Sequence, residues 1–259
     1  MIEYLGRLWE WTPLLLKGIE VTLLISAASM AFSIVLGLLV ALARISNPGR
    51  WYWPVHWLLR AYVETLRGLP LVVTLFIIFF ALPSVGFKIS DDPIIIGIFG
   101  MTLSLAAYLS EVFRAAILSV DPGQMEAALS LGMSKTKAYQ RIVLPQALIV
   151  AVPTLGGYFI SLLKDSSLLG FISVVELFRT GLQLVSVTFR AFEIYFTIGA
   201  IYLALSLLAA WAVSTLEARL RPLEVAYLGH ARPVDIGSVA RGAMRAEPDV
   251  QPESLPMKK

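Results

Sequence analysis

Five long runs of the sequence contain no aspartate, glutamate, lysine or arginine: residues 21–43, 68–87, 93–110, 142–163 and 194–216. A helix needs roughly 20 apolar residues to cross the hydrocarbon core of a bilayer, and each run reaches or approaches that length. The whole chain is 58% hydrophobic, with a mean hydropathy of +0.77. Because a backbone in lipid must satisfy its own hydrogen bonds, helices are the expected structure. We therefore predict an all-α integral membrane protein with about five transmembrane helices.

The basic residues predict how these helices are oriented. The first and third connections between the runs are rich in lysine and arginine, whereas the second has Lys88 beside Asp91 and Asp92. The basic residues of those two connections are Arg44, Arg50, Arg60, Arg67, Arg114, Lys135, Lys137 and Arg141. The positive-inside rule places such connections in the cytoplasm. With five spans, the N-terminus is then expected outside and the C-terminus in the cytoplasm.

The same pattern divides the chain into three parts. Residues 1–18 are expected to form an extracytoplasmic or interfacial segment, and residues 19–220 the transmembrane domain. The first run is too long for the apolar region of a cleaved signal peptide, so it is interpreted as a retained span. Residues 221–259 are expected to be a disordered cytoplasmic tail, because the segment mixes proline, glycine and both charge signs without apolar periodicity.

The third connection, residues 121–145, is polar but is not patterned like a loop. Asp121 and Ser134 stand at helix-capping positions, Pro122 fits a first helical position, and Gly132 supplies a break between two short helices. Apolar residues recur at helical spacing along the first of these helices. A solvated connector needs none of these features. Together they indicate a cytoplasmic helical hairpin that docks onto a partner.

Several kinds of chemistry are not expected of this chain. It has no cysteine and only two histidines, His56 and His230, so a zinc or haem site would lack ligands. It has no G-x-x-x-x-G-K-[ST] phosphate loop with which to hydrolyse ATP itself. It also has no recognisable nucleophile motif, which argues against an intramembrane enzyme. We expect no cofactor, no metal and no nucleic-acid partner.

The hairpin carries a specific motif. Its residues match the pattern "EAA, three residues, G, nine residues, I-x-L-P" at Glu126, Ala127, Ala128, Gly132, Ile142, Leu144 and Pro145. In this the chain resembles the transmembrane permease subunits of bacterial ATP-binding-cassette importers. The segments "ETLRGLPLVV" (residues 64–73), "SLLKDSSL" (161–168) and "ELFRTG" (176–181) are similar to the branch that carries polar amino acids. The resemblance covers roughly residues 22–220.

This resemblance implies a multi-pass protein of the bacterial inner membrane that imports an amino acid or an amino-acid derivative. It implies a second permease subunit, identical or a sister, two cytoplasmic ATPases that bind ATP and Mg, and an extracytoplasmic solute-binding protein. The seven motif residues would couple the permease to the ATPases. A rigid hairpin seated in an ATPase groove would tilt spans three and four when the ATPases close on nucleotide.

Two E-x-x-R pairs, Glu64/Arg67 and Glu111/Arg114, flank uncharged runs on the predicted cytoplasmic side. Residues three apart lie on one face of a helix, so each pair can interact. They are either interfacial pairs with arginines that reach toward water, or a gate of ion pairs at the cytoplasmic mouth of a pathway. The sequence leaves both interpretations open.

Lys164 and Asp165 are adjacent charges between apolar segments, so they must face protein or water rather than lipid. They are either a structural ion pair or, with Ser166 and Tyr158, part of a substrate pathway. Relatives that carry polar amino acids often place an amide or carboxylate near the positions of Gly157 and Tyr158. Here a glycine and a phenol stand in that place.

Small residues recur every four positions in the first run, at Ser29, Ser33, Gly37 and Ala41. This spacing predicts a seam where another helix packs closely.

An ion-coupled secondary transporter or channel is the alternative function. In that case Glu64, Glu111, Lys164 and Asp165 would carry protons or ions. It predicts transport by the chain alone, without an ATPase.

Overall fold

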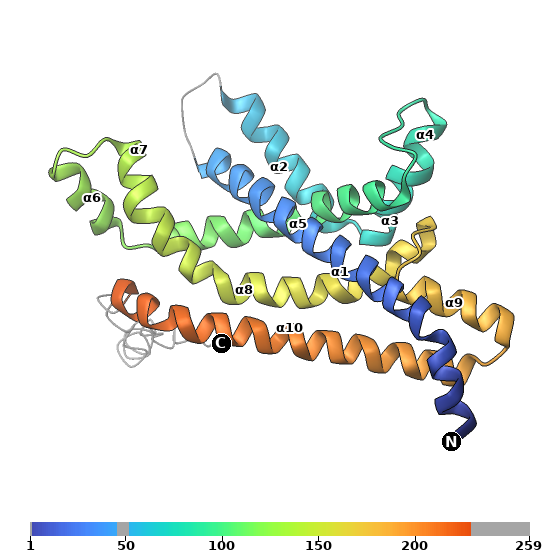
Figure 1. The fold of residues 1–259 in the computed structure, drawn as a ribbon. Coiled ribbons are helices and arrows are strands. Elements are labelled where there is room, and N and C mark those ends of the chain that lie inside the picture. Colours follow the sequence, from blue (N-terminus) through green and yellow to red (C-terminus); the bar gives the residue numbers. More distant parts are fainter. Residues whose placement is uncertain (1, 46–51, 229–259) are drawn as a thin grey trace, which may run out of the picture.

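The computed structural model describes residues 2–45 and 52–228, and no strand occurs among them. Four stretches are long and apolar enough to cross a membrane. They are α1 (Ile2–Ile45), α5 (Pro93–Leu118), the helical stretch Lys135–Ile172 that contains α8 (Leu144–Asp165), and α10 (Ala191–Leu228). A bent helix pair supplies a fifth passage (Figure 1). The predicted all-α fold with about five spans is confirmed.

The second span is broken, which the absence of charges in residues 68–87 did not indicate. Helix α2 (Trp53–Gly68) is followed by α3 (Leu71–Phe76), which continues through the π-helical turn η2 (Ile77–Ala81) into α4 (Leu82–Ser84). Between the two halves the direction of the helix bends by 113°. Pro70 disfavours helical backbone at the residue before it, and Leu69 is accordingly extended, with ψ 137°. The uncharged run is therefore only the second half of a bent passage.

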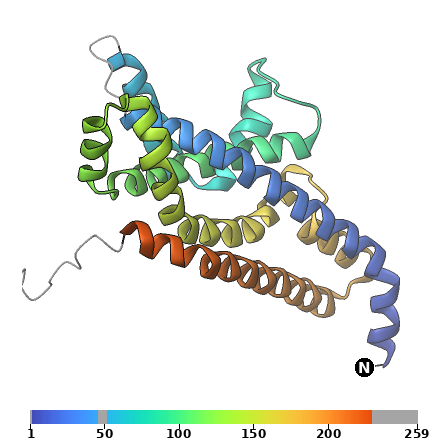
Figure 2. The same cartoon turned by 60° about the vertical axis from the view of Figure 1, so that its left-hand side comes forward.

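The remaining helices connect the spans at the two ends of the molecule. The hairpin consists of α6 (Pro122–Ser130), α7 (Lys135–Ala138) and the π-helical turn η3 (Tyr139–Val143). The 3-10 helix η4 (Ser166–Ile172) and helix α9 (Leu177–Thr188) lie between α8 and α10. The hairpin lies at the same end of the molecule as the last turns of α10, and the start of α1 lies at the opposite end (Figures 1 and 2).

The predicted domain boundaries do not coincide with breaks in the helices. Helix α1 runs unbroken through residue 18, and Trp11 and Leu15 are buried against α9 and α10. This part of the predicted N-terminal segment therefore packs as part of the helical domain. Helix α10 continues past residue 220 to Leu228, and residues 229–259 of the predicted tail lie outside the described residues.

The core is built on the close packing of α1 against α5. Ser29, Ser33 and Ala41 are fully buried, and the Ser33 hydroxyl donates to the carbonyl of Thr102 at 3.3 Å. A Cβ added at Gly37 would lie 2.9 Å from the Cβ of Leu109 and 3.1 Å from the carbonyl oxygen of Ala106. The small-residue seam predicted from the sequence is confirmed.

We expect Gly37→Ala to lower the melting temperature of the purified protein. The added methyl group must push α1 away from α5, and overpacking of this kind costs about 1–3 kcal/mol. Gly157→Ala is the matched control, because a Cβ at that helical position has nothing within 4 Å. Equal melting temperatures for the two variants would contradict the close packing described for Gly37.

Candidate functional site

A pocket of about 260 Å³ lies between the broken second span, α5 and α8. Its wall is mainly apolar, and a few polar groups converge on it, as is typical of small-ligand sites. The lining residues are Leu69, Pro70, Leu71, Met101, Ser104, Leu105, Tyr108, Tyr158, Ser161, Leu162 and Asp165. Discontinuous membrane helices often line substrate sites in transporters, and here the break at Leu69 and Pro70 forms one wall.

Asp165 is the last residue of α8 and supplies the one carboxylate in the lining of this pocket. No described residue forms an ion pair or hydrogen bond with its side chain. An ionisable side chain within a membrane span is expensive, so it generally faces protein or water and has a partner. The pocket therefore offers a carboxylate without a salt-bridge or hydrogen-bond partner in the described residues to a cationic group.

Two tyrosines lie on another side of the pocket. The rings of Tyr108 and Tyr158 have centroids 6.1 Å apart and are tilted by 43°. The Tyr108 hydroxyl donates to the carbonyl of Arg67 at 3.0 Å, and the Arg67 guanidinium lies 5.8 Å from the centre of the same ring. This cation–π contact and the hydrogen bond fasten the end of α2 to α5. They fix the backbone at the break that lines the pocket.

The structure does not bring the four predicted pathway residues together. Tyr158 and Asp165 line the pocket, but Ser166 is fully buried and its hydroxyl donates to the carbonyl of Leu163 at 2.7 Å. Lys164 lines a different pocket, and no salt bridge joins it to Asp165. Consecutive helical residues point about 100° apart, so residues 164, 165 and 166 cannot share one face. Lys164 and Asp165 therefore line separate pockets and form no salt bridge, although each still feels the charge of the other. Whether the two residues form a structural pair or line a pathway stays a prediction.

Sequence reasoning missed Ser104, Tyr108 and Ser161. Ser161 could have been found, because Tyr158, Ser161 and Asp165 follow the i, i+3, i+7 spacing of one helix face. Tyr108 and Ser104 lie on another helix, and nothing local in the sequence connects them to α8.

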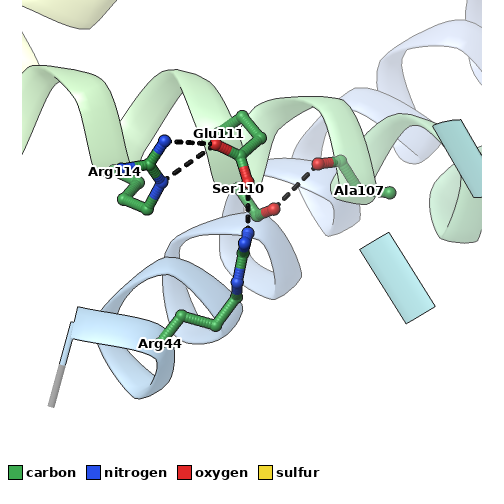
Figure 3. Close-up of polar contacts among 5 residues, drawn as sticks. All are labelled: Arg44, Ala107, Ser110, Glu111 and Arg114. Carbon is green, nitrogen blue, oxygen red and sulfur yellow. Dashed lines mark hydrogen bonds and ion pairs between the residues drawn. The ribbon is translucent and has the colours of Figure 1, made fainter. Parts of the chain in front are cut away.

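The two E-x-x-R pairs behave differently. Glu111 accepts hydrogen bonds from Arg114 at 2.7 and 2.9 Å and also forms an ion pair with Arg44 of α1 (Figure 3). The side chains of Arg44 and Glu111 are only 11% and 19% exposed. Glu64 and Arg67 are both exposed, and no ion pair joins them in the described part of the chain.

Glu111 therefore links α5 to α1 within the same chain. Neither Glu111 nor Arg114 lines the pocket, so the cytoplasmic gate stays a prediction. Sequence reasoning missed Arg44, although it lies three residues after Ala41 and so continues the face of α1 that packs on α5.

The hairpin is capped as predicted. The carboxylate of Asp121 accepts from the backbone N–H of Gly123 at 2.8 Å, and the Ser134 hydroxyl accepts from the N–H of Lys137 at 3.5 Å. Pro122 stands in the first turn of α6. These local signals were sufficient to locate both short helices.

Gly132 ends the first helix with a Schellman motif. The backbone N–H of Gly132 donates to the carbonyl of Leu129, and the N–H of Met133 donates to the carbonyl of Ala128. The φ of Gly132 is +81°, a region that side-chain-bearing residues rarely adopt. A Cβ there would have nothing within 4 Å in the chain itself. Its conformation, rather than crowding within this chain, therefore favours glycine.

The hairpin has an inner and an outer face. Ala128 and Ala138 are buried, whereas Glu126 and Ala127 are exposed, and Leu131 is 84% exposed. The remaining motif residues Ile142, Leu144 and Pro145 are half-buried at the joint with α8. The outer face thus presents apolar side chains beside a carboxylate at one end of the molecule, which is suited to docking.

A broken span, a mostly apolar pocket with few polar groups and a capped hairpin define a membrane permease. The chain belongs to the family of inner-membrane components of binding-protein-dependent transport systems, whose model matches residues 22–222. Among the described residues, no group of three or more histidine or carboxylate side chains is arranged to hold a metal ion.

Several relatives and solved structures resemble the chain over most of its length. The probable amino-acid permease protein YxeN of Bacillus subtilis (strain 168) is 39% identical over 206 residues, which is 77% of this chain and 90% of that protein. The glutamine transport system permease protein GlnP of Escherichia coli (strain K12) is 34% identical over 84% of this chain and 98% of its own length. A crystal structure of an amino acid ABC transporter with histidines has a TM-score of 0.74 and 34% identity, covering 82% of this chain and 97% of that one.

We expect Glu111→Gln to lower the melting temperature, because it leaves the partly buried Arg44 without a counter-charge. The expected loss is about 2–4 kcal/mol, between that of a charge-assisted hydrogen bond and that of a broken buried ion pair. Glu64→Gln is the matched control from the second E-x-x-R pair and should melt like the wild type. A normal melting temperature for Glu111→Gln would show that the Arg44–Glu111 ion pair is not needed for stability.

Proposed function

We propose that this chain is the permease subunit of an ATP-driven importer that carries a polar amino acid, or a derivative of one, across the bacterial inner membrane. The observation that carries the proposal is the Asp165 carboxylate in a pocket at the break of the second span, where it forms no salt bridge with a described residue.

The lining of the pocket supports an amino acid as the substrate. Asp165 would bind the ammonium group or a cationic side chain, and the faces of Tyr108 and Tyr158 would stabilise the same charge. The hydroxyls of Ser104 and Ser161 would fix orientation through hydrogen bonds. The names of YxeN, GlnP and the solved transporter all refer to amino acids or glutamine, which supports this substrate class.

The proposed energy source is a pair of cytoplasmic ATPases that bind ATP and Mg. The hairpin would sit on them through Glu126, Ala127 and Leu131, which are exposed on its outer face. The hairpin joins α5 and α8, and both helices line the pocket, so its movement would reshape the pocket. In this assembly a second permease subunit faces the first, and a solute-binding protein delivers substrate from outside.

The orientation follows from the same proposal. The hairpin end of the molecule would be cytoplasmic, together with the end of α10, and the start of α1 would be extracytoplasmic. This agrees with the lysines and arginines of the hairpin.

We expect Leu131→Asp to abolish co-purification of the ATPase with the full-length permease. The substitution places a charge on an apolar docking face without touching the chain's own core. Val85→Asp is the matched control, since Val85 is also exposed but lies beyond α4, outside the hairpin. Retention of the ATPase by Leu131→Asp at the wild-type level would contradict docking through this face. Uptake by the chain alone in ATP-free vesicles under a proton gradient would instead support a secondary transporter.

We expect Asp165→Asn to fold normally, because this carboxylate forms no salt bridge or hydrogen bond with a described residue, but to lose transport or to prefer neutral over cationic amino acids. The measurement is substrate-stimulated ATP hydrolysis by the reconstituted complex for a panel of amino acids, beside its melting temperature. Asp91→Asn, on the exposed segment between α4 and α5, controls for loss of a carboxylate elsewhere. A normal melting temperature with an unchanged substrate profile would rule out Asp165 as a substrate ligand.

A further inference from the structure

A second pocket, of about 360 Å³, lies beyond the end of α8, between that helix, η4, α9 and α10. Phe178, Ile198 and Gly199 supply apolar wall, and Lys164, Ser167 and Tyr195 supply polar groups. It shares no lining residue with the pocket that contains Asp165. It is therefore separate from the proposed substrate site.

The Lys164 ammonium forms no salt bridge with a described residue, and the adjacent Asp165 acts on it only as a neighbouring charge. Asp165 lines the other pocket. The nearby carboxylate of Glu176 is already occupied, because it accepts from the backbone N–H groups of Phe178 and Arg179 and from the Tyr202 hydroxyl. Lys164 is an exposed cation at the end of a membrane span, so an anion at the membrane surface is a complementary ligand.

The position of Lys164 along α8 indicates where this anion lies. It is 20 residues after Leu144, the first residue of α8 beyond the hairpin, and the intervening helix is roughly 30 Å long. That length matches the hydrocarbon thickness of a bilayer, about 30 Å. Lys164 therefore lies near the membrane interface opposite the hairpin, at the level of lipid headgroups.

An apolar track leads away from the pocket. Gly199 lines the pocket, and Leu203 and Leu207 follow it at four-residue intervals on the same face of α10, 60% and 61% exposed. From Gly199 to Leu207 the helix rises about 12 Å, close to the half-thickness of the hydrocarbon core that one acyl chain crosses. The pocket with its lysine thus lies next to an apolar track that is about as long as one acyl chain of a lipid.

We propose that this pocket binds the phosphate headgroup of an anionic phospholipid, such as phosphatidylglycerol, in the leaflet opposite the hairpin. Lys164 pairs with the phosphate, the Tyr195 hydroxyl donates to a headgroup oxygen, and one acyl chain lies along Leu203 and Leu207. The Ser167 hydroxyl lines the pocket but already donates to the carbonyl of Lys164 at 2.7 Å. A free inorganic anion would satisfy Lys164 but leave the track uncovered, which favours the lipid.

The test uses the full-length chain purified in dodecyl maltoside, titrated with phosphatidylglycerol, phosphatidylcholine or inorganic phosphate. The readouts are the melting temperature and lipid retention in native mass spectrometry. We expect phosphatidylglycerol to raise the melting temperature and the other two to have no such effect. Lys164→Gln should bind phosphatidylglycerol about fivefold more weakly, the loss expected for one lysine–lipid contact.

Two further variants test separately whether binding needs the positive charge of Lys164 and whether it needs the empty volume of the pocket. Lys164→Arg keeps the cation and should retain the response. Gly199→Leu keeps Lys164 but fills the pocket, and its Cβ meets nothing within 4 Å, so the chain should fold and lose the response. Asp91→Asn, on the exposed segment between α4 and α5, should respond like the wild type.

Three outcomes would overturn the proposal. The first is undiminished phosphatidylglycerol binding by Lys164→Gln. The second is an equal response to inorganic phosphate, which would indicate a site for a soluble anion. The third is a disulfide-linked dimer of Lys164→Cys. The chain has no other cysteine, so such a dimer would place a second copy over the pocket.

Discussion

The close approach of α1 to α5 is the contact on which the other features depend. Helix α5 carries one wall of the pocket, bears Glu111 and leads into the hairpin, so its position fixes all three. That position is set where Gly37 and its small neighbours let the two backbones meet. In a bilayer, helices associate largely through such packing, because lipid tails are as apolar as leucine. The Arg44–Glu111 ion pair then fastens the same two helices near the end of α1.

Much of this arrangement could be predicted because its signals are local. An uncharged run of about 20 residues is sufficient to indicate a span, and the hairpin was located by Asp121, Gly132 and Ser134, each acting within a few residues of itself. The break in the second span was also local, at Pro70, but it was hidden by the apolar residues around it. Absence of charge therefore predicts that a segment enters the membrane without predicting its shape.

The rest could not be predicted because it depends on residues far apart in the sequence. Arg44 and Glu111 are 67 positions apart, and the pocket joins Tyr108 to Tyr158 across two helices. Adjacency in the sequence was also insufficient: Lys164 and Asp165 are neighbours along the chain, yet they line different pockets. Opposite charges side by side on a helix have diverging side chains, so each is free to serve a different neighbour.

The hairpin is joined to α8 by continuous helix but to α5 by a short non-helical link. Toward α8 the helical path is unbroken, from α7 through the π-helical turn η3 and Pro145 to the end of η4 at Ile172. Toward α5 it is interrupted by a short non-helical link before Pro122. A movement of the hairpin would therefore pass more directly to α8, which carries Asp165 at its end, than to α5.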